Sequence, residues 1–159
     1  MFHIVLFEPE IPQNTGNIVR TAVSTGSAVH LIRPLGFEIS DKKLKRAGLD
    51  YWYDAKIFYY DSFADFAAKN HGRYFFASTK AAVRYDRAEY RDGDYFIFGP
   101  ESRGLPEALL RERYADAVRI PMTPNNRSLN LANSVAIVIY EALRQGDFEG
   151  LQEKGKISE

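Results

Sequence analysis

Three polar turns, each beside an apolar run, hold most of the side chains in this sequence that could bind a small molecule. They lie in residues 8–22, 98–106 and 120–143. Turns rich in Gly, Asn and Ser bring backbone N–H and C=O groups close to a ligand, and apolar runs supply rigid walls. The sequence therefore predicts a binding cleft built from three distant segments.

The first segment contains a cation suited to a polar ligand. Residues 14–17 read Asn-Thr-Gly-Asn, which is also typical of a simple helix cap. Arg20 follows in the first turns of that predicted helix, near the carboxyl end of the first predicted strand. Ligands bind at that edge of an open parallel sheet. Arg20 is therefore a candidate ligand-binding residue, and a solvated surface arginine is the alternative.

The other two segments add groups that suit a ligand. Gly99 directly follows a predicted buried strand and permits a close backbone approach. Glu101 and Arg103 either pair with each other or face a polar ligand, and a rigid strand-to-helix turn is the alternative. The third segment has more amides and hydroxyls than a connector needs, so Ser128 or Asn130 is expected to cap a helix or line a pocket.

Several enzyme classes leave a sequence signature that this chain lacks. No G-x-G-x-x-G follows the first predicted strand, which argues against an NAD enzyme. The P-loop lysine, the H-E-x-x-H zinc pair and the G-x-S-x-G elbow are also missing from the sequence. His3, His30 and His71 have no metal-ligand spacing, so we expect them to be structural or solvated and expect no metal site.

Composition predicts one globular unit. With 159 residues, of which 45% are hydrophobic, the chain suits a single domain over 1–159, with a frayed tail at 147–159. It has no cysteine, and its formal net charge is +0, so RNA binding would need a local basic patch. The apolar run at the N-terminus is short and has no basic leader. We therefore expect neither a signal peptide nor a membrane span, and a cytoplasmic protein.

Strand-like and helical patterns alternate along the chain, which predicts an α/β fold with a mostly parallel sheet and helices on both faces. The expected strands cover residues 2–7, 28–32, 56–60, 74–77, 94–98 and 117–120. The expected helices cover residues 15–24, 41–47, 61–69, 106–113 and 133–145. The first helix is expected to have Asn14 or Thr15 as its N-cap and Gly26 beyond its end.

The last predicted helix, 133–145, is apolar around most of its circumference. Such a helix carries more apolar surface than the sheet of one small domain can cover. We therefore predict a homodimer that forms through this helix. The alternative is a helix wedged centrally in the core of a single chain.

At the three polar segments the sequence resembles the SPOUT class of RNA methyltransferases, and closely the small TrmL (YibK) type. The resemblance covers nearly the whole chain. Its motifs lie at residues 8–20, 98–106, 120–122 and 128–131, and residues 46–51 also resemble the small type. It implies a SPOUT-type fold whose C-terminal part threads a trefoil knot, one of the rare exceptions to unknotted topology.

The resemblance implies S-adenosyl-L-methionine as cofactor. The implied contacts are Ala77, Gly99, Leu105, Ile120, Met122, Ser128, Leu129 and Asn130. The residue types agree with this reading, because Ile120 and Leu129 suit apolar walls for adenine and a glycine permits close approach.

The implied reaction is S-adenosylmethionine-dependent methylation of the ribose 2′-hydroxyl of the wobble cytidine or modified uridine, the first anticodon nucleotide of tRNA. The resemblance makes Arg20 the main catalytic candidate, with Asn14 and Glu101 in support. Because a guanidinium is a poor base, we expect Arg20 to position the hydroxyl and stabilise charge.

Binding of tRNA is expected to depend on a basic patch of Arg33, Lys42, Lys45 and Arg46. Further arginines that could extend this patch are Arg84, Arg87, Arg91 and Arg127. Two alternatives remain open from the sequence. One is a 2′-O-methyltransferase for another tRNA or rRNA site, and the other is an RNA-binding module without turnover.

Overall fold

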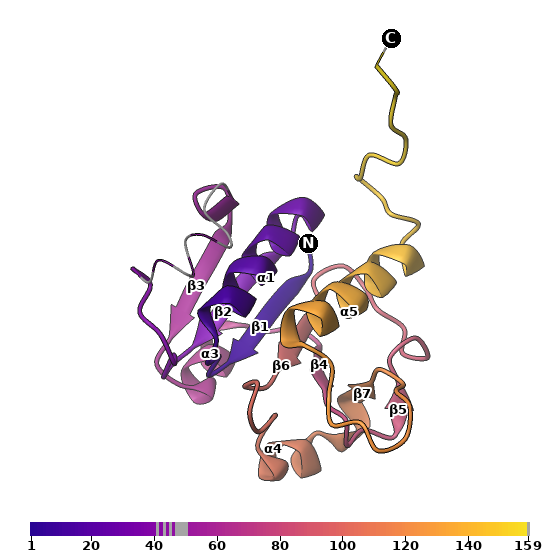
Figure 1. The fold of residues 1–159 in the computed structure, drawn as a ribbon. Coiled ribbons are helices and arrows are strands. Elements are labelled where there is room, and N and C mark those ends of the chain that lie inside the picture. The colour runs from indigo at the N-terminus through magenta and orange to yellow at the C-terminus, as the bar shows by residue number, and fades with distance from the viewer. Residues whose placement is uncertain (41, 43, 45, 47–50, 159) are drawn as a thin grey trace.

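The fold is built on one seven-stranded sheet with the strand order β3-β2-β1-β6-β4-β7-β5 (Figure 1). The computed structural model describes residues 1–40, 42, 44, 46 and 51–158. The strands are β1 (His3–Phe7), β2 (Ala28–Ile32), β3 (Lys56–Tyr60), β4 (Tyr74–Ala77), β5 (Val83–Arg84), β6 (Tyr95–Phe98) and β7 (Ala117–Arg119). All strand pairs in the described chain are parallel, which confirms the predicted sheet class. The carboxyl ends of the strands therefore meet at one edge.

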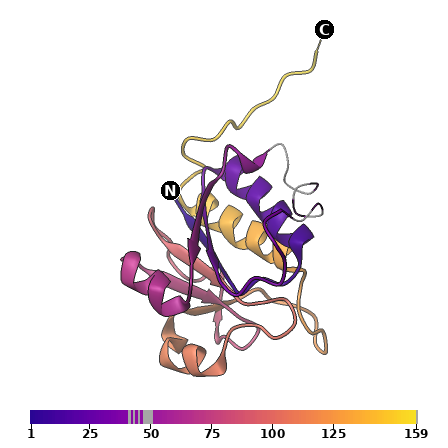
Figure 2. The same ribbon diagram turned by 90° about the vertical axis from the view of Figure 1, so that its left-hand side faces the viewer.

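Helices lie on both faces of this sheet. They are α1 (Pro12–Thr25), α3 (Phe63–Lys69), α4 (Glu107–Glu112) and α5 (Leu131–Gln145), with a 3-10 turn at Tyr114–Asp116. Figure 2 shows α1 and α5 side by side on one face and α3 on the other. Each face has its own core cluster. Ile18 and Val135 belong to the cluster under α1 and α5, whereas Phe66 belongs to the one under α3.

Helix α1 begins three residues before its predicted start. Its N-cap is Ile11, which makes no side-chain cap, and Pro12 occupies the first turn. The prediction of Asn14 or Thr15 as N-cap is wrong, because both lie inside the helix and are buried. Proline suits the first turn, since its fixed φ matches the helix and its missing N–H needs no partner there.

The other predicted elements match the structure with small changes. Ser62 caps α3, where its hydroxyl accepts a hydrogen bond from the Asp65 N–H at 3.0 Å. Strand β5 was not predicted, because two exposed residues carry no readable alternation. The predicted helix at 41–47 lies mostly outside the described residues. The described helices include none that is long and apolar enough to cross a membrane.

Helix α5 packs one side against the sheet and α1 and leaves the other side outside. Seven of its residues, among them Val135, Val138 and Ile139, are buried within the chain. Tyr140 is 46% exposed, and Ala136 and Ile137 are half-buried. The helix is thus not wedged centrally in the core. Beyond it, the residues from 152 to 158 run away from the body as an extended tail (Figure 1).

A chain of polar side chains crosses the core on the α3 face. The rings of His3 and His30 are hydrogen-bonded at 2.9 Å, and the other ring nitrogen of His30 is hydrogen-bonded to the Tyr60 hydroxyl at 2.8 Å. Burial, with the adjacent His3 imidazole, lowers the pKa of His30 to about 3, so His30 is neutral at physiological pH. The described residues contain no cluster of three or more groups able to hold a metal. These two histidines are structural.

Candidate active site

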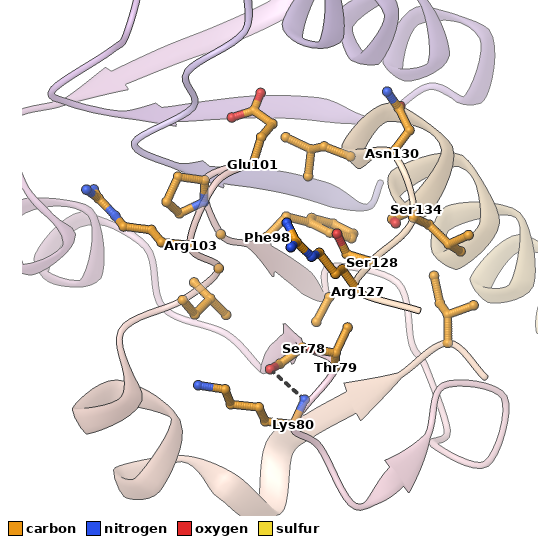
Figure 3. Close-up of a pocket in the computed structure, with 18 of the residues that line it drawn as sticks. Ser78, Thr79, Lys80, Phe98, Glu101, Arg103, Arg127, Ser128, Asn130 and Ser134 are labelled. Carbon is orange, nitrogen blue, oxygen red and sulfur yellow. Dashed lines mark hydrogen bonds between the residues drawn. The ribbon is translucent and has the colours of Figure 1, made fainter. Parts of the chain in front are cut away.

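A cavity of about 730 Å³ lies where strands β4, β6 and β7 end and α5 begins (Figure 3). This volume is within the usual range for small-molecule sites. All eight positions predicted for the cofactor line it, namely Ala77, Gly99, Leu105, Ile120, Met122, Ser128, Leu129 and Asn130. Asn14 and Glu101 line it as well. The structure therefore brings the three predicted segments together at one edge of the sheet.

Glu101 joins the second segment to the start of α1. Its Oε2 accepts a hydrogen bond from the Glu10 N–H at 2.8 Å, and its Oε1 accepts one from the Ile11 N–H at 3.1 Å. The amide of Asn14 donates to the same Oε1 at 3.4 Å. These bonds satisfy backbone donors at a helix start that has no cap of its own, and the carboxylate suits the positive end of the helix dipole.

Two carboxylates of the first segment, those of Glu10 and Glu8, bind residues of the second segment. One oxygen of Glu10 accepts hydrogen bonds from the N–H and the hydroxyl of Ser102, at 3.0 and 2.6 Å. These bonds, with Arg103 nearby, hold the pKa of Glu10 below its usual value. Arg103 pairs with Glu8 at 2.9 Å rather than with Glu101. Each of the two segments thus supplies carboxylates that bind donors of the other, and we call this set of contacts the clasp.

The third segment is tied to the same clasp through two amides. The Asn130 side-chain amide donates to the Asn14 Oδ1 at 3.0 Å. The Asn130 Oδ1 in turn accepts the Asn133 N–H at 3.2 Å, which caps α5. Asn130 therefore both caps a helix and lines the cavity. A continuous hydrogen-bond path runs from α5 through Asn130 and Asn14 to Glu101.

Gly99 permits a close approach, but the approaching group is the chain itself. A Cβ at this position would lie 2.3 Å from both the Gly104 carbonyl carbon and the Leu105 nitrogen. Gly104 adopts a φ of +69°, which side chains rarely tolerate and which lets the loop turn back. Both glycines are therefore needed to form the wall of the cavity.

Arg20 is not brought to this cavity. It lies six residues after Asn14, which places it about 9 Å further along α1 and about 120° around the helix. Its side chain is exposed, and its guanidinium carbon is 5.0 Å from the centre of the Tyr51 ring. Asn14 and Glu101 bond to each other rather than to Arg20. Within one chain, the three predicted catalytic residues do not form one group.

The predicted RNA-binding residues also lie away from the cavity lining. Arg33 follows β2 and pairs with Asp61 at 3.3 Å, with its guanidinium 5.3 Å from the centre of the Tyr59 ring. Lys42 and Arg46 are exposed, and Lys45 lies outside the described residues.

A turn at residues 78–80, which was not among the predicted site residues, forms part of the cavity wall. The Tyr114 hydroxyl donates to the Lys80 carbonyl, and the Arg119 guanidinium donates to the Thr79 carbonyl, both at 2.8 Å. The signal for this turn was available, because it follows β4 at the same sheet edge as the other segments. Ser134 and Val138 of α5 line the cavity as well.

The described lining combines apolar walls with a cationic rim. Leu105, Val118, Ile120, Met122 and Leu129 supply apolar surface. The one carboxylate among the described lining residues belongs to Glu101, and it accepts hydrogen bonds from the backbone just before α1. Lys80, Arg103 and Arg127 are the cations among the described lining residues, and we call them the rim cations. Such a site suits an elongated ligand with a flat apolar part and polar ends.

Comparison with known proteins gives the same picture for nearly the whole chain. The SpoU rRNA Methylase family matches residues 1–140. A tRNA (cytidine(34)-2′-O)-methyltransferase of Methylovorus glucosotrophus is 51% identical, over 94% of this chain and 99% of its own length. A solved structure concerned with the 2-OH methylation of C/U34 on tRNA is 50% identical and superposes with a TM-score of 0.89, over 94% of this chain and 98% of that one. An AdoMet-bound rRNA methyltransferase from Sinorhizobium meliloti is 25% identical, with a TM-score of 0.79 over 90% of this chain and 56% of that one.

Proposed function

The chain belongs to the SpoU rRNA Methylase family, and from that premise we propose that it methylates the ribose 2′-hydroxyl of nucleotide 34, the first anticodon position of tRNA. The observation that carries this proposal is the convergence of three segments on one cavity, in a chain that matches a tRNA (cytidine(34)-2′-O)-methyltransferase over 94% of this chain and 99% of that protein. The substrate nucleoside is a cytidine or a modified uridine.

The cavity fits S-adenosylmethionine by the chemistry of its lining. Ile120 and Leu129 offer apolar surface for the adenine, and Ser128 and Asn130 offer hydrogen-bonding groups for its polar edges. Both oxygens of Glu101 already accept hydrogen bonds from the backbone just before α1, so this carboxylate holds the loop in place. When bound, S-adenosylmethionine would supply an electrophilic methyl group for the ribose 2′-oxygen, leaving S-adenosylhomocysteine, with the hydroxyl proton released to water.

In this proposal Asn14 and Glu101 are positioning residues. Their hydrogen bonds hold the 99–104 loop against the start of α1, and Asn130 extends that hold to the loop before α5. Rigid loops keep the cofactor and the ribose in one geometry, which lowers the entropy cost of the reaction. An apolar, partly dry wall favours a reaction that disperses positive charge.

We propose that the chain is a homodimer formed through residues 133–145, and that Arg20 acts at that interface. Ala136, Ile137 and Tyr140 leave an apolar strip on α5, and α1, the helix that carries Arg20, packs beside α5. A second copy seated on this strip would bring Arg20 of one protomer toward the cavity of its partner. Its guanidinium would position the hydroxyl and the phosphate, because its pKa is too high for a base.

The remaining features of the proposal rest on the family. Residues 1–159 form one methyltransferase domain with a tail at 147–159, and the C-terminal part threads a trefoil knot. Arg33, Lys42, Lys45 and Arg46 bind the tRNA backbone, and the protein works in the cytoplasm, where its substrate is. The shared lining of the cavity by the three segments supports the single domain.

A methylation assay on unmodified tRNA tests the function. The purified protein, S-adenosylmethionine and total tRNA from a strain that lacks the enzyme are incubated, and nucleoside mass spectrometry locates the new methyl group. We expect it on the 2′-oxygen of nucleotide 34. A methyl group at another tRNA or rRNA position would replace the assignment with that site, and RNA binding without transfer would make the protein a binding module.

The role of Arg20 needs its own variant. Arg20→Ala is expected to lower turnover by roughly 100-fold while leaving S-adenosylmethionine affinity within about twofold, since the residue lies outside the cavity lining. Calorimetric titration with the cofactor and single-turnover kinetics separate the two effects. Weakened cofactor binding in this variant would contradict the assignment.

A further inference from the structure

We propose that Arg127 binds the phosphate on the 3′ side of the methylated ribose and thereby positions the 2′-hydroxyl. The inference rests on the proposed function, because it takes RNA as the substrate. It concerns a residue at the mouth of the cavity, whereas the expected basic patch around Arg33 lies outside the cavity lining.

Arg127 is exposed, lines the cavity and extends across it in Figure 3. It makes no ion pair and no side-chain hydrogen bond with any residue that the structure describes. The other two rim cations differ, since Lys80 pairs with Glu107 and Arg103 pairs with Glu8. Arg127 therefore keeps its charge and its donors available for an incoming anion.

The loop that carries Arg127 is anchored close by. Three residues later, Asn130 caps α5 and bonds to Asn14, so the end of the loop is held in place. The backbone near Arg127 is thus held in place, so the guanidinium lies at the mouth of the cavity. Its planar fork of N–H donors matches two oxygens of a phosphate.

The chemistry of the reaction favours a phosphate of the RNA as the anion that Arg127 binds. In RNA the 2′-hydroxyl is on the carbon next to the one that bears the 3′-phosphate. A group that holds this phosphate at the mouth therefore also fixes where the attacking oxygen lies.

The test combines a protein variant with a single neutralised phosphate. The substrate is an anticodon stem-loop RNA in which the phosphate 3′ to nucleotide 34 is native or is a methylphosphonate. With native RNA we expect Arg127→Gln to lower kcat/KM by about 10-fold to 100-fold, the usual range for a lost charge-assisted hydrogen bond. With the methylphosphonate RNA, wild type and Arg127→Gln are expected to be equal.

Controls separate this role from general charge and folding effects. Arg111→Gln removes another exposed arginine, which pairs with Glu107 on α4, and it should leave kcat/KM unchanged. Arg127→Lys should recover part of the loss, because it restores the charge without the fork. The affinity of Arg127→Gln for S-adenosylmethionine alone should equal that of the wild type.

Three results would overturn the inference. If Arg127→Gln and the methylphosphonate each reduce activity and their effects multiply, the two groups do not interact. Loss of S-adenosylmethionine affinity without RNA would assign Arg127 to the carboxylate of the cofactor. Unchanged kcat/KM on native RNA would leave it without a role. If the wild type itself transfers no methyl group to the stem-loop or to tRNA, the proposed function fails instead.

Discussion

Replacing His30 with glutamine is expected to flatten the pH dependence of the stability of this fold. His30 is 2% exposed and hydrogen-bonded to His3 and Tyr60. Its pKa is about 3 in the folded protein, whereas an unfolded chain has a histidine pKa near 6.5. Between these values the unfolded chain binds a proton that the folded chain rejects. The contribution of His30 is therefore complete above about pH 6.5 and is lost as the pH falls toward 3.

The size of the effect follows from the two pKa values. Each pH unit below 6.5 costs about 1.4 kcal/mol, so wild type should lose about 2 kcal/mol between pH 7.5 and pH 5 through His30 alone. The pKa of His3 is also lowered, mainly by burial, so His3 adds to the loss in the same direction. His30→Gln removes the first contribution. The variant should be less stable than wild type at pH 7.5, but between pH 7.5 and pH 5 its free energy of unfolding should fall by about 2 kcal/mol less than that of wild type.

Urea unfolding at pH 7.5, 6 and 5, followed by circular dichroism, measures this difference. Contributions from carboxylates are common to both proteins and cancel when the two pH profiles are subtracted. His71→Gln is the matched control, because His71 is exposed, and its profile should match that of the wild type. If the free energy of unfolding falls equally with pH in wild type and His30→Gln, burial of this imidazole does not cause the loss of stability in acid.

Three other predictions concern the site and its supports. Glu101→Ala should lower the free energy of unfolding by about 2 kcal/mol and weaken cofactor binding, because it removes the side chain that caps α1; full activity and stability in this variant would contradict the clasp. Gly99→Ala should abolish cofactor binding in a calorimetric titration, since its Cβ has no room, whereas Gly155→Ala, which meets nothing within 4 Å, should bind normally. Thr15→Val should raise stability by about 0.5–1 kcal/mol in thermal melts, because the Thr15 hydroxyl is buried without a partner among the described residues; a lower melting temperature would indicate an unseen partner.

The positions of the cavity could be predicted because they follow a rule of parallel sheets. Ala77 and Gly99 end or follow their strands, and Ile120 follows the next one, so all three had to lie at one edge. The same rule applies to the turn at 78–80, which directly follows β4. Packing around α5 was harder to predict, because a helix with apolar residues on most sides does not reveal which side its own sheet covers.

Contacts between distant segments could not be predicted from local patterns. The start of α1 depends on Glu101, which lies 91 positions after Glu10. Capping rules look for a polar side chain next to the helix, and so they favoured Asn14 and Thr15. The direction of the Arg20 side chain could not be predicted for a similar reason, since nearness in sequence to a sheet edge does not fix where a side chain on a helix points. Strand β5 has only two residues, too few for any pattern.

The hydrogen bond between Asn14 and Asn130 spans 116 positions, which has a consequence for protein synthesis. A ribosome delivers the chain from its N-terminus, so β1, β2 and β3 can pair long before Asn130 emerges. Until then Asn14 lacks one of its two side-chain partners, and the cavity lacks the wall formed by the third segment. Chains that stop short of α5 should therefore accumulate as partly folded molecules that bind no cofactor, and methyl donor would protect only finished chains from proteolysis.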